Sequence, residues 1–158
     1  MTEQKAPWSE RLWRNPPLFA LVLLGLGWWA HVGFGNPWPL PWLWLNSVAT
    51  GLFLLAGILA VWAFVCFYRS RTGWEPTDKP CFLIAYGPFK FSRNPAYLAL
   101  LLLLIGAAFW MLDPLVLAAP LLYFLGMNTT QISYEERRLR QQFGSAYDDY
   151  CRKTRRWI

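Results

Sequence analysis

Charged residues are scarce in this sequence. They make up 15% of the chain, whereas hydrophobic residues make up 56%. Ordinary soluble domains carry about 25% charged residues, so the composition argues against a soluble protein and favours a membrane protein. The length of 158 residues suits one domain, and the chain has no internal repeats or low-complexity tracts.

Cysteine and histidine are also rare. Cys66, Cys81 and Cys151 have no metal-type spacing, so we expect free thiols, no disulfide and no metal site. The lone His31 lies near the end of an apolar run, and we expect it to be an interfacial residue rather than a ligand. A net charge of +6 comes without any nucleic-acid-binding motif. Because the basic residues lie beside long apolar runs, the expected partners are membrane lipids and not nucleic acid.

The N-terminal segment lacks the features of a cleaved signal peptide. Residues 1–16 contain acidic residues and prolines, and no small-residue cleavage site follows the first apolar run. We expect this segment to lie at the membrane interface, with Trp8, Leu12 and Trp13 facing lipid and its basic residues facing water.

Long apolar runs dominate the rest of the chain. A helix needs about 20 residues to cross the hydrocarbon core, and each run has proline at or just before its start, where the missing N–H costs nothing. The expected fold is an all-α integral membrane protein with one domain over residues 17–158. Its four spans are predicted at about 17–34, 41–68, 95–112 and 114–131.

The basic residues support this topology. All 15 Lys and Arg residues lie in the N-terminal segment, in the connection 69–94 or in the tail 134–158. With four spans these segments lie on one side, while two tight turns without Lys or Arg lie on the other. We therefore expect both termini in the cytoplasm, at a bacterial inner membrane. A soluble four-helix bundle is disfavoured because its helices need a polar face, and Leu98 to Ile105 has none.

The tail differs from the spans. Gly144 interrupts it, and Ser145 followed by Asp148 resembles a helix start. We expect two short amphipathic helices lying against the cytoplasmic ends of the spans. The apolar positions that recur every three or four residues are Leu139, Phe143, Tyr147 and Tyr150.

Two polar clusters offer chemistry, residues 87–97 before the third span and Glu135-Glu136 after the fourth. A tight turn joins these two spans into an antiparallel hairpin, so Arg93 and Glu135 are expected at the same membrane level. A guanidinium suits a carboxylate, and a carboxylate suits an ammonium or sulfonium, so a ligand carrying both charges would satisfy the pair. The alternative is a snorkelling arginine and a solvated glutamate pair.

Both clusters resemble signatures of the isoprenylcysteine carboxyl methyltransferase family, and phospholipid N-methyltransferases share parts of both. The signature G-P-Y … R-H-P-x-Y-x-G is similar to Gly87-Pro88-Phe89 … Ser92-Arg93-Asn94-Pro95-Ala96-Tyr97-Leu98-Ala99. The signature E-E-x-x-L-x-x-x-F-G-x-x-Y-x-x-Y is similar to Glu135-Glu136-x-x-Leu139-x-x-x-Phe143-Gly144-x-x-Tyr147-x-x-Tyr150. The similarity covers about Cys81 to Arg156, with both signatures in order around one hairpin.

The resemblance implies a membrane enzyme that uses S-adenosylmethionine at its cytoplasmic face, with a lipid-side entrance for an amphiphilic substrate. Arg93 and Glu135 would be the catalytic residues. Glu135 would hold the cationic part of the cofactor, and Arg93 would lie near its carboxylate or order the loop. Glu136 would contact the cofactor or brace the tail helix. The implied cofactor-binding residues are Cys81, Phe82, Leu83, Ile84, Phe89, Asn94, Pro95, Ala96, Tyr97, Glu135 and Glu136.

The chain departs from the family pattern at three positions. Asn94 replaces the family's histidine, Ala99 replaces a glycine, and Gln131 replaces an arginine that contacts the substrate. Gln131 is still the implied substrate residue. Because an arginine would pair with a carboxylate, this change argues against a prenylcysteine carboxylate substrate. The lack of a strong base, however, favours a carboxylate or thiolate acceptor over an amine.

The predicted function is methyl transfer from S-adenosylmethionine to a lipophilic acceptor, with an isoprenylcysteine-type carboxylate as one option. Catalysis would come from in-line positioning and exclusion of water. Two alternatives stay open. One is an NADPH-dependent sterol-type reductase, because sterol reductases carry a related R-H-P-x-Y-x-G segment. The other is a non-enzymatic membrane subunit, suggested by the three departures.

Overall fold

The computed structural model describes residues 15–34, 42–70 and 82–158. In these residues the secondary structure is helical, apart from an isolated bridge between Ser92 and Arg155. In chain order the elements are α2 (Pro16–Phe34), α3 (Trp42–Arg69), η1 (Gly87–Lys90), α4 (Pro95–Met111), η2 (Pro114–Leu117), α5 (Ala118–Thr129), α6 (Gln131–Phe143) and α7 (Ser145–Lys153).

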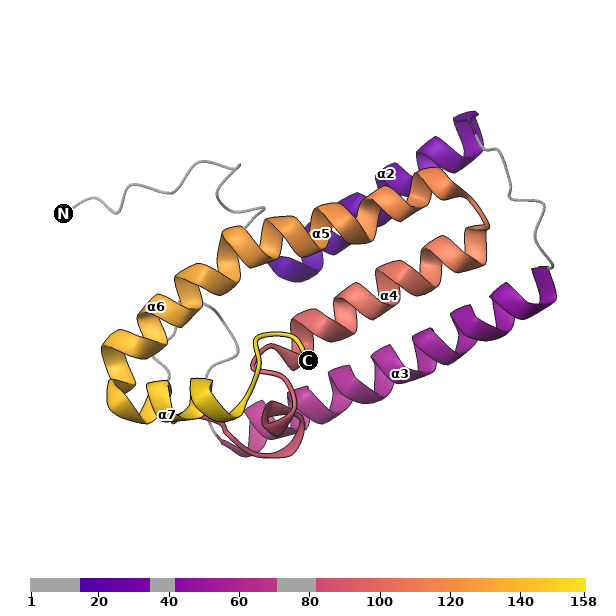
Figure 1. Ribbon diagram of the computed structural model, residues 1–158. Coiled ribbons are helices and arrows are strands. Elements are labelled where there is room, and N and C mark those ends of the chain that lie inside the picture. The colour runs from indigo at the N-terminus through magenta and orange to yellow at the C-terminus, as the bar shows by residue number, and fades with distance from the viewer. Residues whose placement is uncertain (1–14, 35–41, 71–81) are drawn as a thin grey trace.

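Helices α2 to α5 form an elongated bundle, with α4 between α3 and α5 (Figure 1). The approach of α3 to α4 is close because small residues line it. Ala49, Ala56 and Ala63 of α3 are 0%, 3% and 1% exposed. A Cβ on Gly106 of α4 would lie 2.9 Å from the Phe53 ring. Small residues bring helices together in the same way inside membranes, where no hydrophobic effect drives helices to associate.

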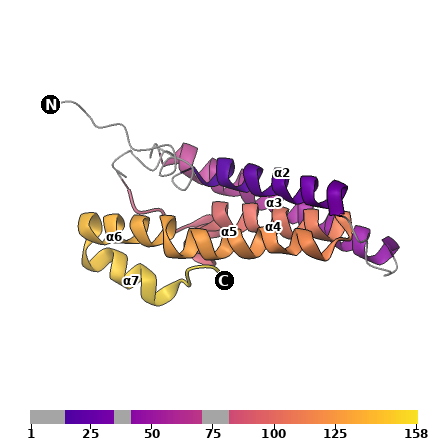
Figure 2. The ribbon, with the colours of Figure 1, turned by 90° about the horizontal axis from the view of Figure 1, so that it is seen from above.

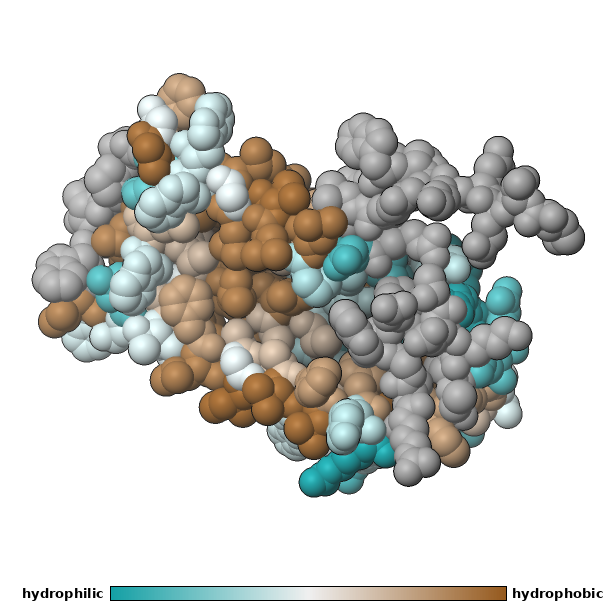
Figure 3. All heavy atoms as spheres, turned by 180° about the vertical axis from the view of Figure 1, so that it is seen from behind, coloured by the Kyte–Doolittle hydropathy of each residue, from teal (hydrophilic) through white to brown (hydrophobic). Residues whose placement is uncertain are grey.

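The outer surface of the bundle is apolar. Leu54, Ile58 and Val61 of α3 are each 64% exposed, and Figure 3 shows hydrophobic side chains over the middle of the bundle and hydrophilic ones toward the end where α6 and α7 lie. Three helical stretches are long and apolar enough to cross a membrane, namely Pro16–Phe34, Leu43–Arg69 and Leu115–Phe143. The apolar α4 is shorter, at 17 residues. These features are those of an integral membrane protein.

The first three apolar runs form helices close to the predicted bounds. The fourth does not form one regular helix over 114–131. It begins with the 3₁₀ turn η2, for which Asp113 accepts a hydrogen bond from the Leu115 N–H. The regular helix α5 ends at Thr129, and the hydroxyl of Thr130 donates back to the Gly126 carbonyl. Such back-bonding competes with regular helix geometry and bends helices.

Helix α6 follows α5 at once and continues in the same general direction (Figure 1), so helical structure runs without a gap through residues 131–134, between the predicted fourth span and the predicted tail. The predicted break at Gly144 is confirmed, with φ of +53° and ψ of −127°. The capping expected from Ser145 is wrong, since no side chain caps α7. Asp148 instead accepts a hydrogen bond from Arg140 Nε at 2.8 Å.

Helix α7 folds back beside α6 (Figures 1 and 2), and the chain then returns to the start of α4. Tyr147 and Tyr150 are buried, as their apolar spacing indicated. Several predictions lie outside the described residues, namely the interfacial segment up to residue 14, the turn at 35–40 and Cys81. Of the predicted free thiols, Cys66 and Cys151 are unpaired in the part of the chain that the structure describes.

Candidate functional site

The turn that leads into α4 is fixed by close packing. Gly87 has φ of +61°, and a Cβ there would lie 2.9 Å from Cys66 Sγ, so glycine is required both for conformation and for space. The buried Phe89 packs edge-on against Phe67, with ring centroids 5.3 Å apart. Tyr150 of α7 donates its hydroxyl proton to the Phe89 carbonyl at 2.7 Å. Burial raises the pKa of Tyr150, which keeps it a donor.

The C-terminal segment, residues 154–158, binds the same turn. The Arg93 N–H donates to the Arg155 carbonyl at 3.0 Å. The Asn94 side chain donates through Nδ2 to the Arg156 carbonyl at 2.9 Å, and the Asn94 N–H donates to Ser92 Oγ at 3.1 Å. These bonds hold the residues before α4 in place, and they fix the backbone position from which the Arg93 side chain extends.

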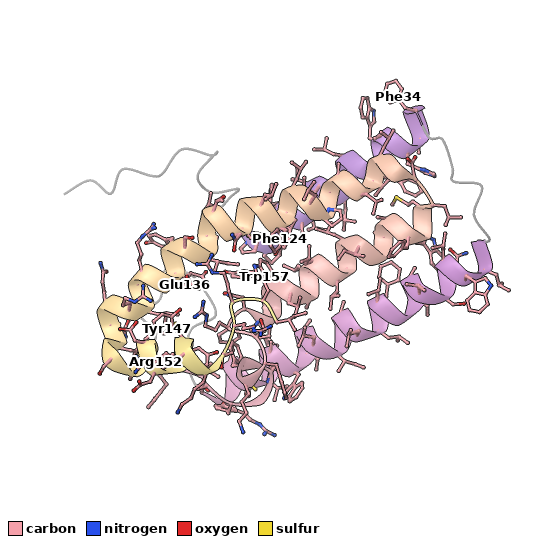
Figure 4. The ribbon with its side chains drawn as sticks, viewed as in Figure 1. Phe34, Phe124, Glu136, Tyr147, Arg152 and Trp157 are labelled. Carbon is pink, nitrogen blue, oxygen red and sulfur yellow. The ribbon has the colours of Figure 1, made fainter. Side chains whose placement is uncertain are left out.

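Glu136 joins the hairpin to the C-terminal segment. Its carboxylate accepts a hydrogen bond from Arg93 Nη2 at 2.8 Å, and two from Arg156, from Nε at 3.0 Å and from Nη2 at 2.5 Å. The Arg93 and Glu136 side chains are each 14% exposed, and that of Arg156 is 32% exposed. The hydrogen bond to Glu136 raises the pKa of the Arg156 guanidinium. In Figure 4, Glu136 points from α6 toward the segment that carries Trp157.

Glu135 has a different set of partners. Its Oε1 accepts a hydrogen bond from the Tyr97 hydroxyl at 2.5 Å and one from Gln131 Nε2 at 2.8 Å. Gln131 is 3% exposed. Tyr97 packs against a core cluster that contains Tyr123, whose buried hydroxyl has no hydrogen-bond partner in the described residues. Neutral donors therefore orient the Glu135 carboxylate.

The two polar clusters do meet, which confirms that the hairpin brings them to one level. Arg93 contacts Glu136, however, whereas Glu135 contacts Tyr97 and Gln131. Consecutive helix residues are rotated by about 100° around the axis, so neighbouring glutamates on α6 point to different sides. The sequence predicted the level of the acidic pair without predicting which glutamate faces the arginine.

Three of the other implied cofactor residues lie against α3. Ile84 and Phe89 are buried in a cluster with Ala63 and Cys66, and Ala96 packs against it. Phe82 is 66% exposed. Leu83 is half-buried and Pro95 is buried. The structure therefore brings Tyr97 to Glu135 and Asn94 to the Arg156 carbonyl, and it packs Ile84 and Phe89 against α3.

Sequence reasoning missed Asn128 and the C-terminal residues. Asn128 Oδ1 accepts hydrogen bonds from Arg156 Nη1 at 2.9 Å and from Trp157 Nε1 at 3.3 Å. The Trp157 ring lies 5.1 Å from that of Phe124, and both are labelled in Figure 4. The basic and aromatic residues at the chain end were the one sequence feature that could have pointed to this contact, and such residues are ordinarily expected at a protein surface.

Comparison with known proteins gives the family. The model of the phospholipid methyltransferase family matches residues 44–146. An uncharacterized protein of Haemophilus influenzae is 37% identical over 62 residues, which are 39% of this chain and 98% of that protein. Probable protein-S-isoprenylcysteine O-methyltransferases from the indica and japonica subspecies of Oryza sativa are each 34% identical over 72 residues.

The match to the rice proteins covers 46% of this chain and 38% of theirs, so the chain spans well under half of their length. No solved structure matches. The family model covers well over half of the chain and includes the turn before α4 and both glutamates of α6. The resemblance drawn from the two signatures is thereby confirmed, and this protein belongs to the phospholipid methyltransferase family.

Proposed function

We propose that this membrane protein transfers a methyl group from S-adenosylmethionine to a lipophilic acceptor. The observation that carries the proposal is the meeting of both signatures at one end of the bundle, with Glu135 and Glu136 in different environments. Family membership supports methyl transfer, and the apolar helices support an acceptor that is soluble in the bilayer. The comparisons favour neither the reductase nor the non-enzymatic subunit.

The donor set at this end fits S-adenosylmethionine. The hydrogen bonds to Glu135 come from neutral groups, and a bound ammonium or sulfonium would supply the positive charge that favours its ionised carboxylate. Arg93 and Arg156 together carry more positive charge than Glu136 offsets, which suits a carboxylate. Other implied cofactor residues, which lie before α4 and at its start, would contact the apolar parts of the cofactor.

The chain's own contribution is positioning. When bound, the cofactor supplies an activated methyl group on a sulfonium. Glu135, oriented by Tyr97 and Gln131, would hold the ammonium end. Arg93, fixed by Glu136 and by the Arg155 carbonyl, would order the loop before α4. The apolar helices would exclude water and align the acceptor with the methyl group.

We also propose that α4 is a fourth span, which makes the hairpin α4–α5 transmembrane. Its 17 residues lie at the lower limit for crossing the hydrocarbon core. The basic residues of α6, α7 and the C-terminal segment then lie at the cytoplasmic face, with both termini. A bacterial inner membrane is the proposed location.

The test is calorimetric titration of S-adenosylhomocysteine into the purified protein in detergent, compared with two variants. The wild type is expected to bind. Glu135→Gln removes the negative charge and is expected to weaken binding roughly 10- to 100-fold, the range for a hydrogen bond to a charged group. Asp149→Asn removes an exposed acid from α7 and is expected to bind like the wild type. The absence of binding to folded wild type, or equal binding by Glu135→Gln, would contradict the proposal.

A further inference from the structure

Glu135 is a partly buried acid whose hydrogen-bond donors carry no charge. It lies on α6, beyond the hairpin α4–α5. Its Oε1 accepts hydrogen bonds from the Tyr97 hydroxyl at 2.5 Å and from Gln131 Nε2 at 2.8 Å. Its neighbour Glu136 differs, because that acid pairs with two arginines. The contacts of Glu135 therefore supply dipoles but no counter-charge.

The elements that meet near Glu135 bring neutral side chains. Helix α4 brings Tyr97, and α5 brings Tyr123, whose side chain is fully buried. Helix α2 adds apolar side chains to the same cluster, and the C-terminal segment adds Trp157. Glu135 is thus an ionisable group at the edge of an apolar cluster.

The positive charges at this end act mainly on the other acid. Arg93 and Arg156 each donate to the Glu136 carboxylate through Nη2, at 2.8 Å and 2.5 Å. Arg138, three positions beyond Glu135 on α6, favours the ionised form of Glu135, but it is the weakest of the influences on this carboxyl group. The protein therefore gives a full counter-charge to Glu136 and not to Glu135.

An ionised Glu135 is unfavourable in these surroundings. Withdrawal from water disfavours the charged form of an acid, and neutral hydrogen-bond donors offset that cost only in part. Burial accordingly raises the pKa of the Glu135 carboxyl, and the hydrogen bonds from Tyr97 and Gln131 lower it by less. In the free protein Glu135 therefore holds its proton to a higher pH than an ordinary glutamate, whose pKa is about 4.3.

The Tyr123 hydroxyl is a polar group of this cluster that is not satisfied. It is buried and has no hydrogen-bond partner in the described residues, which costs free energy. It also interacts electrostatically with Glu135. Because a hydroxyl can rotate to turn its hydrogen toward a negative charge, ionisation of Glu135 would give Tyr123 a charge to face. The cluster suits an ionised Glu135 once a cation balances the charge.

We propose that the ammonium group of the bound cofactor expels a proton from Glu135, so that the affinity for S-adenosylmethionine depends on pH. The inference rests on the proposed function, because the same carboxylate holds the cofactor. When the ammonium binds, the O–H bond of the neutral carboxyl group breaks, its electron pair stays on the carboxylate and the proton goes to bulk water. The ammonium then supplies the counter-charge that Tyr97 and Gln131 do not supply.

The direction of the pH dependence follows from this exchange. As the pH falls below the pKa of Glu135 in the free protein, the acid must lose its proton before the ammonium binds, and affinity weakens by up to about tenfold for each pH unit. Above that pKa no proton is released and the affinity is constant. An ordinary glutamate, with a pKa of about 4.3, would leave the affinity almost unchanged above about pH 5.5.

The test is calorimetric titration of S-adenosylhomocysteine into the purified protein in nonionic detergent, from about pH 5.5 to about pH 7, where the amino group of the ligand stays protonated. Each titration is run in MES and in Bis-Tris, because these buffers differ in their heat of ionisation and the difference in measured heat counts the protons released. The wild type is expected to release protons and to bind at least about threefold more weakly at the lowest pH than at the highest.

The outcomes separate this proposal from the proposed function. Binding that is independent of pH and releases no proton would overturn the proposal and leave the proposed function standing. The absence of binding at every pH would overturn both.

Two variants identify the group that loses the proton. Glu135→Gln has no proton to release, so its weaker binding should be constant over this range, and its deficit relative to the wild type should shrink as the pH falls. Asp149→Asn, which removes an exposed acid of α7, should release as many protons as the wild type. Proton release that persists in Glu135→Gln would overturn the proposal.

His31 is a second candidate for the proton, because histidine side chains commonly titrate in this range. It lies at the opposite end of the bundle, against Asp113. His31→Gln is therefore expected to keep the proton release of the wild type. Loss of the proton release in this variant would assign the proton to His31 and overturn the proposal.

Tyr97→Phe carries the test if Glu135→Gln does not fold. The change removes a hydrogen bond that favours the ionised carboxylate of Glu135. The weakening of S-adenosylhomocysteine binding with falling pH should therefore begin at a higher pH than in the wild type. A purely structural role of Tyr97 would lower the affinity equally at every pH, and that result would overturn the proposal.

Discussion

The two ends of the bundle carry different polar chemistry. At one end, His31 Nδ1 and Asp113 Oδ2 lie 3.0 Å apart and join α2 to the turn after α4. Asp113 is buried, and its other oxygen accepts from the Leu115 N–H. At the opposite end, Glu136 ties the turn before α4 to α6 and the C-terminal segment (Figure 4).

The difference lies in what remains after the local hydrogen bonds are satisfied. The partners of Asp113 account for both of its oxygens, so this pair connects helices and leaves little for a ligand. The pair also gives His31 a partner within the protein, which its lone position in the sequence did not indicate. At the Glu136 end, guanidinium donors and positive charge are left over. These spare polar groups are the reason for proposing that the cofactor binds at the Glu136 end and not at the Asp113 end.

The largest effect on stability is expected for Glu136→Gln. The change leaves Arg93 and Arg156 without their shared counter-charge, which is expected to lower the free energy of unfolding by about 3 kcal/mol, the lower part of the range for breaking a buried pair. Denaturant titration in mixed micelles measures it. A decrease in the free energy of unfolding no larger than that of Asp113→Ala, at the other end of the bundle, would contradict the difference between the two ends.

An intermediate effect is expected for Asp113→Ala. The variant loses the contact with His31 and the cap of η2, and the expected cost is about 1–2 kcal/mol, typical of a lost helix cap. Binding of S-adenosylhomocysteine should be unchanged, because this end holds no part of the proposed site. Asp113→Asn, which keeps a cap oxygen, serves as the control. Weaker binding of S-adenosylhomocysteine by either variant would show that the ends are not independent.

The smallest effect is expected for Arg152→Gln. Arg152 lies on α7 near the candidate site (Figure 4) and pairs with Asp149, but the two side chains are 73% and 57% exposed. Exposed pairs contribute little because water and salt screen them. No measurable change in unfolding or in binding of S-adenosylhomocysteine is expected. A clear loss of stability or of binding would show that exposed charged residues at this end also contribute.

Much of the fold was predictable because its signals are local. Apolar runs bounded by proline predicted α2, α3 and α4 close to their observed bounds, and Gly144 predicted the break between α6 and α7. The start of α6 was not predicted, because a span that bends at Thr130 and one that ends there have the same apolar pattern. The hydrogen bond from the Thr130 hydroxyl to the Gly126 carbonyl favours the bend, and the apolar pattern of the sequence does not reveal it.

The candidate site was predictable in part. The signatures located Arg93 and the glutamate pair, and the tight turn placed them at one end. The rotation of α6 about its axis decides that Glu136, and not Glu135, faces Arg93. That rotation depends on packing over the whole length of α5 and α6. Arg156 could not be foreseen, since it contacts the Asn94 side chain from 62 residues away in the sequence.

The sequence by itself determined the number of apolar runs, the antiparallel hairpin and the level at which the polar residues of the two signatures meet, because each depends on residues a few positions apart. The tertiary structure alone decided which acid pairs with which base, and it brought the C-terminal segment to the site. Such contacts join residues far apart in the chain, and only the packed bundle fixes their distance and direction.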